Sequence, residues 1–127
     1  MEFINVIAAA IAAFAFGAAW YMSFAKPWMA ATGMTQEQQD GAGSGPYILA
    51  FVGAVLTAGM MRHIFVAANI EGIGAGIVSG FGIGAFIAAP WIINNCAFEG
   101  RSKSLMLING GYAAGGCTVI GLVLNLF

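Results

Sequence analysis

Four long apolar stretches constrain this chain more than any other feature of its sequence. A helix that spans a bilayer needs about 20 mostly apolar residues, because the hydrocarbon layer is about 30 Å thick and offers no water to backbone amides. Residues 6–24, 47–68, 72–97 and 105–127 each meet that length. We therefore predict an all-α, antiparallel bundle of four transmembrane helices, forming a single membrane domain over residues 1–127.

The composition favours the same class of protein. Hydrophobic residues make up 61% of the chain and charged residues 7%, with a net charge of −1 and a mean hydropathy of +0.90. So few charges cannot cover a water-soluble surface, and no basic tract is present that would bind nucleic acid. The expected partner is the lipid bilayer. No Lys or Arg precedes the first apolar segment, so we interpret it as a retained span rather than a secretory signal.

The loops carry one signal for structure and one for orientation. In the first loop, residues 25–46, Thr35 and Gln38 have the spacing of a capping box, which predicts a short interfacial helix. Lys26, Arg101 and Lys103 all fall in loops on one side of the predicted bundle. The positive-inside rule makes that side cytoplasmic and places both termini in the periplasm.

All Trp and Tyr residues map to the half of the bundle near the longer loops. A belt of rings that anchors the helices at headgroup depth explains this distribution. Belts usually occur at both interfaces, so the alternative is that some of the rings line a shared site. The residues are Trp20, Tyr21, Trp28, Tyr47, Trp91 and Tyr112.

Small residues recur at every fourth position in the third and fourth segments. Helices in a membrane gain little from burying one apolar surface against another, so they depend on close backbone contact at such residues. The spacing predicts contact within the bundle, or alternatively a homo-oligomer interface or a docking face for another membrane subunit. The third segment is expected to be the centre of the bundle. The predicted contact residues are Gly72, Gly76, Gly80, Gly84 and Ala88, with Gly111 and Gly115 in the fourth segment.

Pro90 lies inside the third segment and predicts a kink, because proline lacks an amide donor and its ring crowds the carbonyl of Phe86. Asn94 and Asn95 are candidates to donate to that carbonyl. The cysteines, Cys96 and Cys117, differ in depth by roughly 18 Å at 1.5 Å of rise per residue. We expect both to be free, small residues of the core.

Arg62 is the most unusual residue, because a charge inside the bilayer costs at least about 2.5 kcal/mol on insertion scales. Three interpretations stay open: snorkelling to the outer interface, an interior pair with Glu71, Glu2 or a carbonyl, and a path for a solute or proton. The adjacent His63 is expected to make a structural hydrogen bond. Without a second His or Cys at ligand spacing it does not predict a metal site, and no cofactor is expected.

A denser group of polar residues surrounds the hairpin between the third and fourth segments. We interpret it as a polar clasp that holds two helix ends together, with a binding pocket or a catalytic site as the alternatives. It offers no second acid, no nucleophile with a base and no metal set, so no enzymatic activity is expected. Its members are Asn94, Asn95, Glu99, Arg101, Asn109 and Tyr112.

Two runs of the sequence carry a family resemblance, FGAAWYMSFAKPWMAATGMTQE and APWIINNCAFEGRSKSLMLINGGY, and the most specific part runs from Asn94 to Tyr112. Over nearly its whole length the chain resembles a bacterial family of small four-helix membrane proteins known as domain of unknown function 1761. Ala113 stands where such sequences often have histidine, which weakens the case for a titratable site there. The resemblance implies the four-helix fold and an inner-membrane location, and it brings no established activity.

Two functions follow as hypotheses. The first is a structural or accessory subunit that packs through its glycine-rich helix faces into a homo-oligomer or a larger membrane complex. The second is a small channel or carrier for a solute or ion, with Arg62, His63 and the asparagines along a polar path. The sequence has no recognisable inverted repeat or selectivity filter, which favours the first hypothesis.

Overall fold

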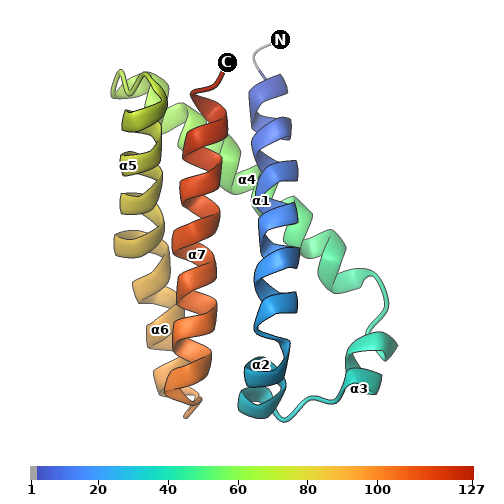
Figure 1. Ribbon diagram of the computed structural model, residues 1–127. Coiled ribbons are helices and arrows are strands. Elements are labelled where there is room, and N and C mark those ends of the chain that lie inside the picture. The colour runs from blue at the N-terminus through green and yellow to red at the C-terminus, as the bar shows by residue number, and fades with distance from the viewer. Residues whose placement is uncertain (1–2) are drawn as a thin grey trace.

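The computed structural model describes residues 3–127 and consists of helices joined by short connections (Figure 1). Four stretches are long and apolar enough to cross a membrane: α1, α4, the continuous stretch Ile73–Phe98 that contains α5 and α6, and α7. The predicted all-α fold with four spans is confirmed. The elements are α1 (Ile4–Ser23), α2 (Ala25–Thr32), α3 (Gln36–Gly41), α4 (Gly45–Ala67), α5 (Ile73–Ile83), a π-helical turn (Gly84–Ala88), α6 (Ala89–Phe98) and α7 (Lys103–Leu124).

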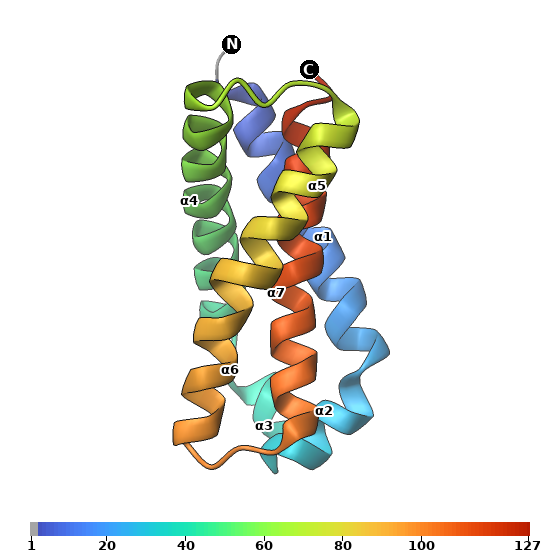
Figure 2. The same ribbon diagram turned by 90° about the vertical axis from the view of Figure 1, so that its left-hand side faces the viewer.

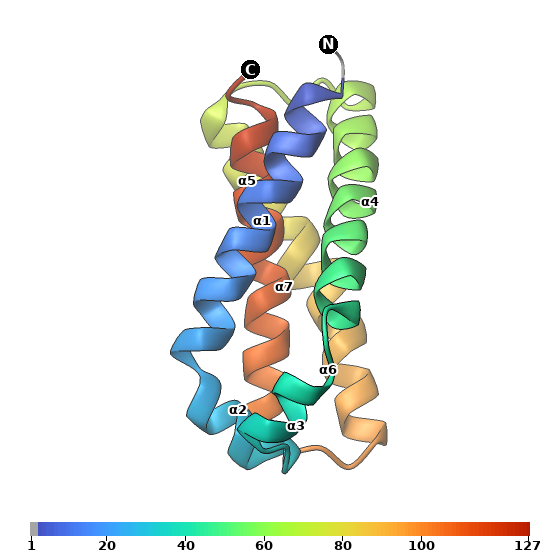
Figure 3. The same cartoon turned by 90° about the vertical axis from the view of Figure 1, so that its right-hand side faces the viewer.

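The bundle has two distinct ends. The start of α1, the end of α7 and the α4–α5 connection lie together at what we call the terminal end (Figure 1). The α6–α7 connection and the short helices α2 and α3 lie at the loop end (Figure 3). This arrangement follows from the short connections, which make neighbouring spans antiparallel.

Helix α7 is the centre of the bundle, with α1 on one side and α5 and α6 on the other (Figures 1 and 2). It is also the most buried of the four spans. The sequence predicted the third span in this position, and that prediction is wrong. The physical reason is that α7 has small residues on two faces, so helices approach it closely from both sides. Its buried residues are Leu105, Ile108, Gly110, Gly116, Cys117, Ile120, Gly121 and Leu124.

The apolar core lies where α1, α4 and α7 meet, toward the terminal end. Alanines at Ala9, Ala10 and Ala58 are completely buried and let α1 and α4 approach each other closely. Met61 and Phe65 of α4 fill the remaining space against α7. Within residues 3–127, every buried side chain is apolar, while many large hydrophobic side chains are exposed on the outside. An apolar outer surface of this extent suits a lipid environment.

Pro90 follows a π-helical turn rather than interrupting a regular α-helix. The wider turn gives the proline ring room beside the preceding carbonyls, and π turns and prolines are recognised causes of helix bending. Figure 2 shows the change of direction between α5 and α6. Asn94 and Asn95 are exposed, and within the described residues neither donates to the carbonyl of Phe86, so this expected hydrogen bond is not made.

The first loop folds as the capping signal predicts. The Thr35 hydroxyl accepts from the backbone N–H of Gln38 at 3.2 Å, and the Gln38 side chain accepts from the N–H of Thr35 at 2.9 Å. These two bonds begin α3. The preceding helix, α2, contacts α7. Both cysteines are free and buried, as expected.

Candidate functional site

Three members of the glycine ridge on the third span face α7. A Cβ added at Gly84 would lie 2.7 Å from the Cα of Ala114, and one at Gly80 would meet the carbonyl oxygen of Cys117. A Cβ at Gly76 would lie against the backbone of Gly121. The two backbones are therefore too close for any side chain between them, and this ridge is a contact within one chain.

The glycines predicted on the fourth span face α1 instead. A Cβ at Gly111 would lie 2.7 Å from the indole ring of Trp20, and one at Gly115 would collide with the ring of Phe16. Gly17 of α1 has the reciprocal role, because a Cβ there would lie 2.7 Å from the ring of Tyr112. Aromatic rings of one helix thus rest on glycines of the other.

Two predicted ridge residues have other roles. Gly72 precedes α5 with a φ of +90°, a backbone conformation that favours glycine, and nothing lies within 4 Å of its added Cβ. Ala88 is half-buried at the end of the π-helical turn. Gly110 was not predicted as a contact residue, but a Cβ added there would lie 3.3 Å from the side chain of Ile93 on α6. The spacing of Ala89, Ile93 and Cys96 along one face of α6 is the sequence pattern that could have predicted this contact between α6 and α7.

The predicted polar clasp of the α6–α7 hairpin divides into separate groups. Asn109 faces α1, where its side-chain oxygen accepts a hydrogen bond of 2.7 Å from the Tyr21 hydroxyl. The Tyr112 ring lies beside that of Tyr21, with 5.2 Å between centroids. Trp20 donates from its indole N–H to the carbonyl of Ile108 at 2.9 Å. The resulting aromatic cluster joins α1 to α7 in the half of the bundle near the loop end.

The remaining predicted residues of that hairpin lie on the outer surface. Asn94 and Asn95 are exposed. Glu99 and Arg101 form an ion pair of 3.4 Å, with side chains 61% and 43% exposed. An ion pair in such a position contributes little to stability. These residues do not meet Asn109 or Tyr112, so the structure does not bring the predicted six-residue site together.

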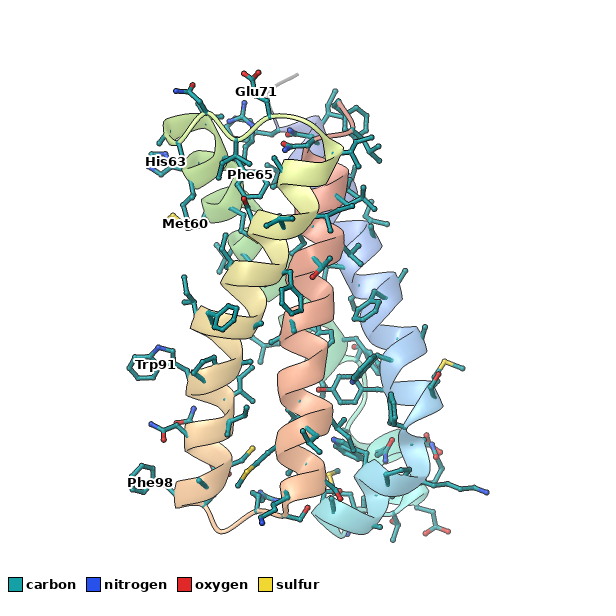
Figure 4. All side chains as sticks on the ribbon, turned by 60° about the vertical axis from the view of Figure 1, so that its left-hand side comes forward. Met60, His63, Phe65, Glu71, Trp91 and Phe98 are labelled. Carbon is teal, nitrogen blue, oxygen red and sulfur yellow. The ribbon has the colours of Figure 1, made fainter. Side chains whose placement is uncertain are left out.

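The Trp and Tyr residues divide between an exposed group and a group that packs between two helices. Trp91 and Tyr47 are 71% and 64% exposed, and Figure 4 shows Trp91 directed away from the bundle, as in an interfacial belt. Trp20, Tyr21 and Tyr112 instead form the aromatic cluster between α1 and α7. Their one-sided distribution therefore has a packing component as well as an interfacial one.

Arg62 and His63 point to different surroundings. His63 is exposed and directed away from the bundle (Figure 4), and within residues 3–127 it makes no hydrogen bond, so the structural hydrogen bond predicted for it is wrong. Arg62 is half-buried, and its guanidinium carbon lies 5.8 Å from the centre of the Phe3 ring, a cation–π contact at the terminal end. Among the described residues no carboxylate lies within 4 Å of Arg62, so the pair with Glu71, one of the three interpretations considered, is not formed. Glu2, the other acid considered, lies outside the described residues.

Arg62 lines a pocket of about 260 Å³ at the terminal end. Amide groups surround it from three elements. Asn125 donates to the carbonyl of Gly72 at 2.8 Å, which fixes the α4–α5 connection against α7. Asn5 donates weakly to the carbonyl of Leu124 at 3.4 Å, and its side-chain oxygen is buried with no hydrogen-bond partner among residues 3–127. The lining residues are Asn5, Arg62, Phe65, Val66, Asn69, Ile70, Glu71, Leu124, Asn125 and Phe127.

The four apolar spans and the apolar outer surface define the class: this is a multi-pass, α-helical membrane protein. Residues 4–125 match the family model described as Protein of unknown function (DUF1761), and the chain belongs to that family. The resemblance carried by its sequence runs is thereby confirmed. Comparisons with curated proteins and with solved structures find no significant match.

Proposed function

We propose that the protein is a structural or accessory subunit, without enzymatic activity, that associates with copies of itself or with another membrane protein. One observation carries this proposal: four glycines, on α4 and on α5, contact no other element of the described chain. A Cβ added at any of them would have no heavy atom of another element within 4 Å. They are Gly53 and Gly59 on α4, and Gly74 and Gly82 on α5.

Such glycines need a compensating contact. Glycine inside a helix is about 1 kcal/mol less favourable than alanine, and in membranes the usual compensation is the close approach of a second helix. The inward glycines of α5 obtain it from α7, whereas Gly74 and Gly82 obtain none within the described chain. Val78, midway between them, is 72% exposed, so this side of α5 faces outward. A partner helix resting on Gly74 and Gly82 would supply the missing contact.

The proposal is tested by two leucine substitutions placed two residues apart on α5. Gly82→Leu adds a side chain to the outward face, and we expect it to abolish assembly while the monomer remains folded. Gly80→Leu is the matched control, because its side chain would collide with α7 and lower the free energy of unfolding by about 1–3 kcal/mol or more. Native mass spectrometry after gentle extraction measures assembly, and thermal unfolding measures stability.

Two results would contradict the proposal. One is a wild-type protein that is extracted as a monomer with no protein partner. The other is a Gly82→Leu variant that assembles like the wild type. An unchanged Gly80→Leu protein would instead contradict the contact between α5 and α7.

We further propose a bacterial inner-membrane location with the loop end in the cytoplasm. Lys26, Arg101 and Lys103 all belong to the loop end, and Arg101 is exposed there. Positive residues near span ends are retained on the cytoplasmic side. Both ends of the chain would then be periplasmic.

A channel or carrier is the second candidate, favoured by the polar pocket around Arg62. Phe65 and Leu124 are almost fully buried at that pocket, and the core beyond it is apolar. A single chain therefore lacks a polar path through the bilayer, and transport would need several copies. Solute flux into liposomes that is abolished by Arg62→Ala would favour this candidate over the first.

A further inference from the structure

The pocket around Arg62 combines groups of opposite chemical character. The guanidinium of Arg62 presents donors and a positive charge, and it suits a phosphate. The buried oxygen of Asn5 accepts from no donor in the described part of the chain, and such an atom is costly to leave unsatisfied. Glu71, an exposed acidic residue, also lines the pocket. A ligand that satisfies all three must carry both an anionic group and a hydrogen-bond donor.

Simple ions fit this set of groups poorly. An anion would bind Arg62 but would be repelled by Glu71 and would leave the Asn5 oxygen without a donor. A metal cation or a lone ammonium would be repelled by Arg62. The pocket volume of about 260 Å³ also exceeds the share of one water molecule in the liquid, roughly 30 Å³, several times over. The space therefore suits a group of several atoms.

The position of the pocket favours a lipid as the source of that group. Arg62 lies five residues before the end of α4 at Ala67, or roughly 8 Å along the helix axis, which is the depth of the boundary between headgroups and acyl chains. Phe65 is only 3% exposed and forms an apolar wall, while Val66 and Phe127, 64% and 76% exposed, face outward. A polar pocket with exposed apolar side chains beside it matches a headgroup joined to acyl chains.

We infer that this pocket binds the headgroup of a zwitterionic phospholipid that carries a phosphate and a primary ammonium, as in phosphatidylethanolamine. The phosphate contacts Arg62, and the ammonium faces Glu71 and donates to Asn5, whose oxygen is covered in this structure and becomes accessible when its side chain rotates toward the pocket. All of these groups belong to one chain. The lipid site therefore does not depend on the proposed assembly. Lipid retention tests the site, and the Gly82→Leu variant tests the assembly, so either proposal can be contradicted without the other.

Lipid retention by the full chain tests the inference. The protein is extracted into detergent, mixed with equal amounts of phosphatidylethanolamine, phosphatidylcholine and phosphatidylglycerol, and its bound lipid is measured by native mass spectrometry. We expect phosphatidylethanolamine to be retained in clear preference to the other two. Phosphatidylcholine lacks the ammonium donor, and phosphatidylglycerol lacks the positive charge. Equal retention of the three, or a preference for phosphatidylglycerol, would overturn the inference.

Variants assign the preference to the pocket. Arg62→Met should reduce retention of phosphatidylethanolamine about tenfold, the typical effect of losing one charge-assisted hydrogen bond. Asn5→Leu should reduce the discrimination against phosphatidylcholine. Arg101→Met removes one positive charge at the exposed loop end. It should change neither the retention of phosphatidylethanolamine nor the discrimination against phosphatidylcholine. A preference for phosphatidylethanolamine that survives Arg62→Met would overturn the inference. If that variant does not fold, the comparison of the three lipids on the wild-type protein still tests the inference.

A competition experiment with soluble phosphoethanolamine distinguishes a lipid headgroup from a free zwitterion, because both carry the same phosphate and ammonium groups. In excess, it should leave the bound lipid in place, because it lacks the acyl chains that contact Val66 and Phe127. Displacement of the lipid at equal concentration would overturn the assignment to a lipid and would identify a soluble zwitterion as the ligand.

Discussion

At the scale of single residues, the polar side chains near the loop end form their hydrogen bonds between α1 and α7, and not within the α6–α7 hairpin. The sequence placed Asn109 and Tyr112 in a clasp of the α6–α7 hairpin, but the hydrogen-bond partner of Asn109 is Tyr21, which is 88 positions earlier in the chain. A spacing of three residues places Asn109 and Tyr112 on one face of α7. It does not reveal which neighbouring helix that face meets, because α7 has neighbours on both sides.

The bond between Tyr21 and Asn109 gives a prediction at this scale. Tyr21→Phe keeps the ring that packs on Tyr112 and removes only the hydroxyl. Hydrogen bonds between membrane helices are worth about 0.6 kcal/mol on average, so we expect a loss of that order in the free energy of unfolding. Unfolding of the purified protein in mixed detergent micelles measures it.

Tyr47→Phe is the matched control, because Tyr47 is exposed on α4 and makes no hydrogen bond within the described residues. The control should unfold like the wild type. A loss of equal size in both variants would show that the hydroxyl of Tyr21 contributes nothing specific. Combining Tyr21→Phe with Asn109→Ala should give less than the sum of the two single effects.

At the scale of elements, the contact between α5 and α7 shows what glycine spacing can predict. Gly76, Gly80 and Gly84 were expected to allow close helix contact, and they face α7 at backbone distance. Gly74 and Gly82 look the same in the sequence but face open space. The difference depends on the rotation of α5 about its axis, which is set by three-dimensional packing and not by composition.

Pro90 gives a prediction about the α5–α6 stretch. Pro90→Ala restores a backbone donor and removes the ring, so the π-helical turn loses its local cause and the helix should straighten. Spin labels on the exposed residues Ala75 and Ala97 should then be farther apart than in the wild type. An unchanged distance would mean that contact with α7, rather than the proline, maintains the bend.

The sequence predicted the spans, the capped helix α3 and the free cysteines because each depends on local spacing or on bilayer thickness. It did not predict that α7 is central, or that Arg62 and Asn5 line one pocket. Asn5 begins α1, whereas Arg62 is near the end of α4. Only the antiparallel assembly of three helices brings such residues together, and no local pattern records that assembly.

At the scale of the whole molecule, the bundle has its chain ends together and its basic residues at the opposite end. We expect a fluorescent reporter that matures only in the cytoplasm to be dark at either terminus and bright when inserted in the loop between α3 and α4. The positive-inside rule is the physical reason, with Lys26, Arg101 and Lys103 retained on the cytoplasmic side. A bright reporter at either end would reverse the proposed orientation.

The central helix, α7, comes after the three spans that surround it in the chain. Ribosomes deliver a chain at about 5–20 residues per second from the N-terminus, so α1, α4 and α5 enter the bilayer before their common partner exists. Until then, the glycine face of α5 and the indole of Trp20 lie open to lipid or to the insertion machinery. Packing of these four spans is therefore completed only when α7 arrives, and a chain interrupted within α7 should be recognised and degraded by membrane proteases.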